Sequence, residues 1–153
     1  MKCLFTTFLS VVSAVAAFAD HTASQVAAKA ALEESVRMEE YRGSIYAQAR
    51  IDGIDYRTIL RKAIDLDEDA IKTLFSMRFM GVGGESHCAN LLLLMKLWGD
   101  DHFAKTLAGR SERIRDLVVG SIDYAWANPE WNKYPRTLET SPNSITKRTK
   151  AKQ

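Results

Sequence analysis

The chain has 153 residues, 46% of them hydrophobic and 26% charged, with 21 basic and 19 acidic side chains. This composition predicts one globular domain that can bury a core, and it excludes collagen-like and low-complexity chains. A net charge of +2 and two cysteines also exclude a strongly basic nucleic-acid binder, a disulfide framework and a four-cysteine zinc site.

Residues 1–19 have the layout of a signal peptide. Lys2 precedes an uncharged apolar run that ends in Ala-Phe-Ala at positions 17–19, which is typical of a signal peptidase site. We therefore predict cleavage before Asp20 and export to the periplasm or the cell exterior, with no stable membrane insertion afterwards. The alternative is a retained anchor, although threonines and serines dilute a run that is already short for about 30 Å of hydrocarbon.

Cleavage would remove Cys3 and leave Cys88 as the only cysteine of the mature chain. Export places that thiol in an oxidising compartment, where a single cysteine has no partner within its own chain. The mature monomer therefore has no internal disulfide, and we expect its stability to come from helix packing.

Hydrophobic spacing and capping residues predict an all-α domain over residues 20–128. Apolar residues recur at intervals of three and four, and short turns with glycine or aspartate separate the segments. Asp55, Asp67 and Asp100 each precede a segment and are suited to cap a helix N-terminus. We expect five to six helices, over residues 24–41, 56–64, 68–80, 87–98, 100–107 and 112–126.

Two further expectations concern the arrangement of these helices. The sequence Gly-Val-Gly-Gly at 81–84 should end the preceding helix, and Ser86 should cap the next one. Because residues 87–98 are apolar on all sides, we expect this helix at the centre of the core. The thin apolar stripe of residues 24–41 predicts an N-terminal covering helix at the edge of the fold.

One internal similarity runs through the domain. Asp-Glu-Asp-Ala-Ile-Lys-Thr-Leu at 67–74 and Asp-Asp-His-Phe-Ala-Lys-Thr-Leu at 100–107 align at an offset of 33 residues. The order of helix, acidic turn and helix around both segments resembles a degenerate αα-hairpin repeat of the ankyrin or HEAT kind. The resemblance implies two stacked hairpins with flanking helices as caps. The Thr-Pro-Leu-His opening of ankyrin repeats and a third copy are missing, so an ordinary helical bundle is the alternative.

The helical spacing stops after residue 128. Pro135 and Pro142 lie within residues 129–153, and the last residues carry four basic side chains between positions 147 and 152 with no acid. We predict an irregular, basic and solvated C-terminal tail. We expect no nucleic acid as a partner, because four charges without interleaved aromatic residues bind little against salt screening.

His87 and Cys88 are the candidate catalytic residues. A cysteine near a helix N-terminus and beside an imidazole can become a nucleophile or a redox centre. Cys88 nevertheless shares the apolar stripe of Leu91, Leu92 and Met95, where cysteine behaves as a small hydrophobe. Consecutive helical residues also point about 100° apart, so the two side chains should not face each other. We therefore assign no catalytic residue and keep this pair as the alternative.

The remaining motifs predict neither a metal nor a cofactor. His21, His87 and His102 lack the spacing of a zinc site, and the glycines at 81–84 are not followed by the lysine of a phosphate-binding loop. The carboxylates at 65–69 and 100–101 are explained by helix capping.

With no chemical motif left, we predict an exported, non-enzymatic helical module that binds another protein or has a structural role. The alternative is a small exported enzyme or redox protein that uses Cys88 with His87. Neither the identity of a partner nor the oligomeric state follows from the sequence.

Overall fold

A computed structural model describes residues 22–126, 130–141 and 143. Over these residues the chain is all-α, as the sequence predicts, and contains no strand. The same residues form eight α-helices and one short 3₁₀ helix, so the expectation of five to six helices was too low. The predicted signal peptide and the basic end of the predicted tail lie outside the described residues.

The first helix covers residues 22–37. The later elements are, in chain order, α2 (Ile45–Ile51), α3 (Tyr56–Ile64), α4 (Glu68–Ser76), α5 (Gly81–Trp98), α6 (Asp100–Ala108), α7 (Glu112–Ala125), the 3₁₀ helix η1 (Trp131–Lys133) and α8 (Pro135–Glu139).

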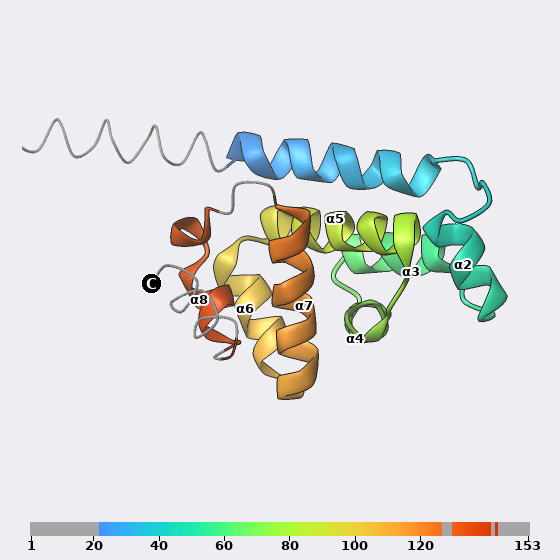
Figure 1. Cartoon of the computed structure of the whole chain (residues 1–153). Helices are drawn as coiled ribbons and strands as arrows, with labels where there is room; N and C mark the ends of the chain where they lie inside the picture. Colours follow the sequence, from blue (N-terminus) through green and yellow to red (C-terminus); the bar gives the residue numbers. More distant parts are fainter. Residues whose placement is uncertain (1–21, 127–129, 142, 144–153) are drawn as a thin grey trace, which may run out of the picture.

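Helix α5 is the centre of the fold (Figure 1). It packs most extensively on α7 and also contacts α2 and α6, while α3 packs mainly on α4. Leu91, Leu94 and Met95 of α5 are at most 1% exposed, and so are Val118 and Ile122 of α7. Because burying such a side chain stabilises the fold by about 1.5–3 kcal/mol, the contact between α5 and α7 is a main source of stability.

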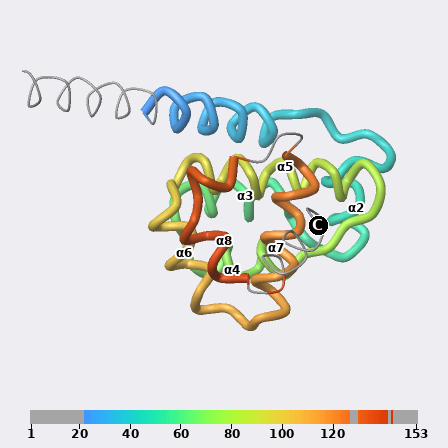
Figure 2. The backbone as a smooth tube through the Cα atoms, turned by 60° about the vertical axis from the view of Figure 1, so that its left-hand side comes forward, coloured from blue at the N-terminus to red at the C-terminus, as the bar shows by residue number. Residues whose placement is uncertain are grey.

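The N-terminal helix covers one side of α5 and runs antiparallel to it (Figures 1 and 2). The Gln25 amide near its start donates a hydrogen bond of 3.0 Å to the Leu97 carbonyl near the end of α5. Only a narrow stripe of Ala28, Leu32 and Val36 is buried. This thin stripe is why the helix lies at the edge of the core.

The glycines at 81–84 belong to the first turn of α5 instead of ending the helix before it, and α4 already ends at Ser76. A Cβ on Gly83 would lie 2.4 Å from the Gln48 amide nitrogen, and one on Gly84 would lie 2.7 Å from the Phe79 carbonyl oxygen. These glycines therefore permit close packing. Ser86 does not cap α5, because its hydroxyl donates to the Val82 carbonyl within the helix.

Helix α2 is one of the elements that the sequence analysis missed. The first helix ends at residue 37 instead of 41, and the chain turns through Gly43, whose φ is +88°. Ser44 then caps α2 by accepting a hydrogen bond of 3.2 Å from the Ala47 N–H. A serine directly after a glycine was the local signal for this start.

Helix α8 and η1 lie in the segment predicted to be irregular. Pro135 stands at the first position of α8, where its missing N–H costs nothing. The Asp100 carboxylate accepts hydrogen bonds from the N–H groups of Arg136, at 2.9 Å, and Thr137, at 2.7 Å. The prediction that Asp100 caps α6 was therefore wrong, because its oxygens bind the start of α8. The predicted caps at Asp55 and Asp67 are confirmed.

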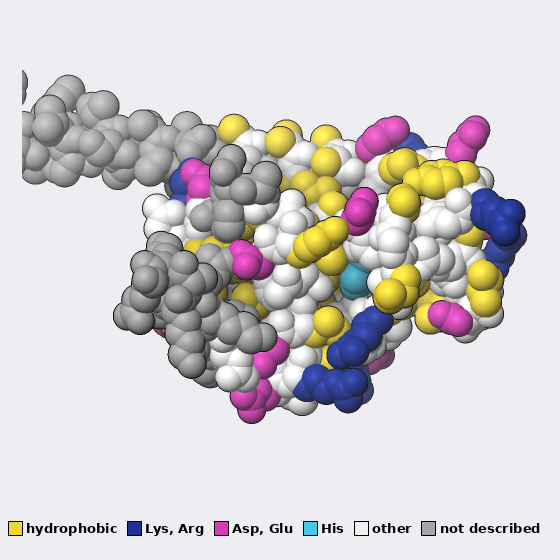
Figure 3. Space-filling view, in the orientation of Figure 1, with side chains coloured by type: hydrophobic (Ala, Val, Ile, Leu, Met, Phe, Trp, Pro, Cys, Tyr) yellow, Lys and Arg dark blue, Asp and Glu magenta, His cyan; other side chains and the backbone are white. Residues whose placement is uncertain are grey.

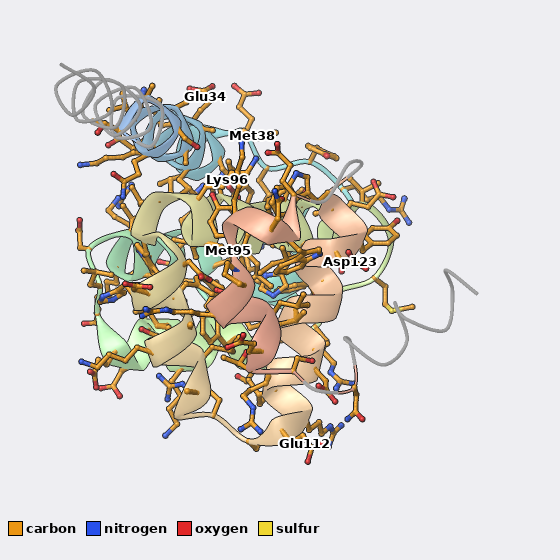
Figure 4. All side chains as sticks on the ribbon, turned by 90° about the vertical axis from the view of Figure 1, so that its left-hand side faces the viewer. Glu34, Met38, Met95, Lys96, Glu112 and Asp123 are labelled. Carbon is orange, nitrogen blue, oxygen red and sulfur yellow. The ribbon has the colours of Figure 1, made fainter. Side chains whose placement is uncertain are left out.

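The C-terminal segment follows the length of α7. Figure 4 shows Glu112 and Asp123 toward opposite ends of this helix. The Trp131 indole N–H donates to Asp123 at 3.1 Å, and the Asn143 amide donates to Glu112 at 3.0 Å. Trp131 and Asn143 are thus attached toward opposite ends of α7.

Candidate functional site

The structure places His87 and Cys88 on α5 and does not bring their functional atoms together. His87 is 4% exposed, and Cys88 is half-buried with a free thiol. No hydrogen bond within the described residues joins the thiol to the imidazole. A cysteine nucleophile activated by histidine requires that contact, so the geometry offers no thiolate–imidazolium pair.

His87 instead belongs to a buried polar cluster with Tyr56 of α3 and Asn90 of α5. The Asn90 amide donates to the Tyr56 hydroxyl oxygen at 3.3 Å, and the Tyr56 oxygen lies 3.0 Å from Nδ1 of His87. The donor of the bond between Tyr56 and His87 is set by the histidine tautomer, and either tautomer joins the two rings.

Burial controls the ionisation of this cluster. It lowers the pKa of His87 to about 4 and raises the pKa of the Tyr56 hydroxyl. The Phe79 ring packs edge-on against both, with centroids 5.6 Å from Tyr56 and 5.3 Å from His87. Both groups keep their neutral forms near pH 7, and the hydrogen bond between them joins α3 to α5.

The other predicted residues do not assemble into a chemical site. The described residues contain no group of three or more His, Cys, Asp or Glu side chains that could hold a metal ion. His102 is exposed on α6, and His21 lies outside the described residues. Asp67 and Asp100 are occupied as helix caps, and Asp101 forms an exposed ion pair of 2.9 Å with Arg136.

A different feature stands out on the surface, at the end of the molecule formed by α2, the connection before it and the start of α5. Large hydrophobic side chains are exposed there, and Ile51 and Met80 are 84% and 83% exposed. Figure 3 shows hydrophobic side chains exposed at this end and elsewhere on the same face. We call this surface the apolar end; it consists of Met38, Tyr41, Ile51, Met80 and Val82.

The Gln48 side chain holds the three segments of the apolar end together. Its amide nitrogen donates to the Gly43 carbonyl at 2.9 Å and to the Met80 carbonyl at 3.0 Å, and its oxygen accepts from the Met80 N–H at 3.2 Å. The missing side chain of Gly83 leaves the space that Gln48 occupies. The exposed side chains are therefore carried by a fixed backbone.

A hollow of about 370 Å³ lies near the start of α3, and none of the five residues of the apolar end lines it. Its walls include the charged side chains of Glu40, Arg50, Asp55 and Arg57. Glu40 also forms an ion pair of 2.6 Å with Arg50 there. The hollow is therefore a charged feature, distinct from the exposed hydrophobic side chains.

The sequence analysis missed the apolar end because it assigned these residues to helices or turns one at a time. Met38 and Tyr41 continue the helical spacing of the N-terminal stripe, but the helix ends at residue 37 and leaves them exposed. Met80 and Val82 flank Gly81, and two large apolar residues beside a glycine were the available signal.

No helix among the described residues is long and apolar enough to span a membrane. Comparisons of the chain with protein-family models, with curated proteins and with solved structures gave no match.

Proposed function

We propose that the chain is a non-catalytic helical module that binds another protein through the apolar end. One observation carries this proposal: five large hydrophobic side chains from three segments are exposed at one end of a domain whose core is otherwise well buried. Single exposed hydrophobic residues are ordinary on a protein surface, whereas a group of them at one end is typical of an interaction site.

The chemistry of the apolar end fits a protein partner. Ile51 and Met80 protrude furthest, and the flexible thioether of methionine adapts to differently shaped surfaces. The ion pair between Glu40 and Arg50 supplies the polar rim that surrounds the apolar centre of many interfaces. We expect the partner to cover Ile51 and Met80.

The backbone of the apolar end is already ordered, which favours binding. Besides the contacts of Gln48, the Arg57 guanidinium donates to the Val36 carbonyl at 3.2 Å and also to the Met38 carbonyl. The Arg57 guanidinium carbon lies 4.1 Å from the centre of the Tyr46 ring. A partner would therefore lose little free energy to the ordering of this surface.

Site-directed photo-crosslinking in the native host tests the proposal. A photoreactive amino acid replaces Met80 in one strain and Tyr124 in another, since Tyr124 of α7 is also apolar and 70% exposed but lies outside the apolar end. We expect one protein to be crosslinked in stoichiometric amount from position 80 and not from position 124. The proposal is wrong if position 80 yields no defined product, or if both positions yield the same one.

Purified proteins give the quantitative test. The double variant Ile51→Ser/Met80→Ser should weaken the binding of the crosslinked partner at least tenfold in calorimetry, because central apolar anchors carry most interface energy. Tyr124→Ser serves as the matched control and should leave the affinity unchanged. If Tyr124→Ser weakened partner binding equally, the apolar end would not be the binding surface.

Catalysis by Cys88 with His87 is the competing proposal, and a thiol measurement distinguishes it. A half-buried cysteine without an imidazole partner should react with a bulky alkylating reagent much more slowly in the native protein than after unfolding. Equal rates, with a thiol pKa well below 8.5, would support the redox or enzymatic role instead.

We also infer that α3–α4 and α5–α6 are two copies of one hairpin unit. The matched residues Leu74 and Leu107 are both fully buried. The matched hydroxyls of Thr73 and Thr106 donate to carbonyls four residues earlier, at 2.8 and 2.9 Å. Similar environments at matched positions favour a repeat over a chance similarity between two helices.

Export remains part of the proposal. The mature protein purified from the host should begin at Asp20, as N-terminal sequencing would show. Full-length chain found only in the membrane fraction would establish the retained anchor in its place.

A further inference from the structure

A second surface feature lies between the α3–α4 turn and α6. Figure 2 shows α6 beside α3 and α4. Two hollows of about 310 and 360 Å³ adjoin there and share Leu66 and His102 in their walls. Trp98 lines the first hollow and Arg110 lines the second. We call this feature the α6 groove; it shares no residue with the apolar end.

One residue in the wall of each hollow has a hydrogen-bond donor without an acceptor among the described residues. These donors are the indole Nε1 of Trp98 and the guanidinium Nε of Arg110, and both atoms are shielded from solvent. Buried N–H groups are almost always paired, because an unpaired one costs about 1–3 kcal/mol. Because neither atom is exposed to its hollow, a ligand pairs with it only after a movement of the side chain.

The charged residues along the α6 groove are mainly basic. Lys29 lines the first hollow, and Lys105 and Arg110 line the second, whereas Glu68 is the one acidic side chain in either wall. The permanent cations thus outnumber the acid over a short length of surface. Such an arrangement favours an anion, since charge-assisted hydrogen bonds are stronger than neutral ones.

Leu66, in the walls of the α6 groove, has a φ of 65°, and it is the only described residue other than glycine in the left-handed region. This conformation ends α3, because the N–H groups of Leu66 and Asp67 donate to the Ala63 and Lys62 carbonyls, as in many helix C-caps. The conformation places an exposed apolar side chain in the walls of both hollows.

We propose that the α6 groove binds a small amphiphilic organic anion, with its apolar body against Leu66 and Trp98 and its acidic group on Lys105 and Arg110. The apolar walls exclude a purely inorganic anion as the preferred ligand, and the cationic end excludes a neutral one. The site is independent of the apolar end, so either proposal can fail without the other.

Nuclear magnetic resonance of the ¹⁵N-labelled mature protein tests this site directly. The Trp98 indole N–H, assigned with the variant Trp98→Phe, is observed while 2-naphthoate is added. We expect a saturable shift of this resonance, because the aromatic rings of the ligand would lie against the Trp98 side chain and change the magnetic environment of its N–H. The Trp131 indole N–H should not move, since it already donates to Asp123.

Two further probes separate the contributions of charge and apolar surface. The neutral 2-naphthalenemethanol has the same ring system without the charge, and acetate has the carboxylate without the rings. Each should bind at least tenfold more weakly than 2-naphthoate, which corresponds to about 1.4 kcal/mol or more. Equal binding of the neutral compound, or no saturable shift at roughly 10 mM naphthoate, would overturn the proposal.

A pair of matched lysines supplies the control for the protein side. Lys105 and Lys72 are exposed and occupy equivalent positions in the two aligned segments, but only Lys105 lines the α6 groove. Lys105→Gln should weaken 2-naphthoate binding about three- to tenfold, and Lys72→Gln should leave it unchanged. If both substitutions weaken binding equally, the effect is one of net charge and the site is wrong. Arg110→Gln gives a second measurement and should also weaken 2-naphthoate binding. If Arg110→Gln fails to fold, Lys105→Gln alone tests the site.

Discussion

The two acidic turns of the domain have nearly the same sequence and use their aspartates differently. Asp67 accepts a hydrogen bond of 2.8 Å from the Ala70 N–H and so caps its own helix, α4. Asp100 occupies the matched position before α6, but its carboxylate binds the N–H groups of Arg136 and Thr137 at the start of α8. The first aspartate acts locally, whereas the second joins segments 36 residues apart.

This difference shows what distinguishes the two hairpins despite their similarity. Both present a buried leucine and a bonded threonine on the second helix, so their core positions match. Only the second hairpin has a C-terminal segment packed beside it, and that segment takes the capping carboxylate. We therefore expect substitutions in the matched cores to have equal effects and substitutions of the matched aspartates to differ.

The largest effect is expected at the matched leucines. Leu74→Ala and Leu107→Ala each remove a fully buried side chain and leave a cavity, which should lower the free energy of unfolding by about 2–5 kcal/mol. Urea denaturation followed by circular dichroism measures both. Ile51→Ser, at an 84% exposed position, is the control and should cost much less. A large difference between the two leucines would contradict the equivalence of the hairpin cores.

The second effect concerns the joint between the two hairpins, where Tyr56 of α3 binds His87 of α5. Unfolded chains protonate histidine near pH 6.5, whereas burial lowers the pKa of His87 in the folded protein to about 4. The unfolded state therefore binds more protons between these values, and stability must fall as the pH falls through this range. We expect a loss of about 2–3 kcal/mol between pH 7 and pH 4.5 from this residue.

The variant His87→Gln isolates that contribution, because glutamine keeps a hydrogen bond with Tyr56 without titrating. Urea denaturation of both proteins at several pH values gives the difference, in which the carboxylates common to both cancel. The variant should lose less stability than the wild type on acidification. Parallel curves for the two proteins would show that His87 is not buried in its neutral form.

The third effect tests the aspartates themselves. Asp67→Ala should cost about 0.5–2 kcal/mol of global stability, as the loss of an N-cap does. Asp100→Ala should release α8 and leave α6 intact, so amide hydrogens of residues 136–141 should exchange at least tenfold faster. Hydrogen exchange with mass spectrometry separates the two outcomes. Faster exchange confined to α6 after Asp100→Ala would show instead that Asp100 caps α6, as the sequence predicts.

The sequence analysis identified interactions between residues close together in the sequence and missed those between distant residues. Asp55 and Asp67 were assigned correctly because a cap needs only a partner three residues later. The bonds of Asp100 to α8 and of Tyr56 to His87 cross 31 or more residues, and no local pattern encodes them. The apolar end was missed for the same reason, since Gln48 assembles it across 32 residues.

The smallest effect is expected for the ion pair beside Asp100. The Arg136 guanidinium lies 2.9 Å from Asp101, but the two side chains are 65% and 77% exposed. Water and salt screen such a pair, so Arg136→Gln should cost less than about 0.5 kcal/mol and leave amide exchange in α8 almost unchanged. The backbone N–H of residue 136 survives this substitution and still binds Asp100. If Arg136→Gln released α8 as fully as Asp100→Ala does, then charge attraction, and not the capping of backbone N–H groups, would hold the C-terminal segment to the second hairpin.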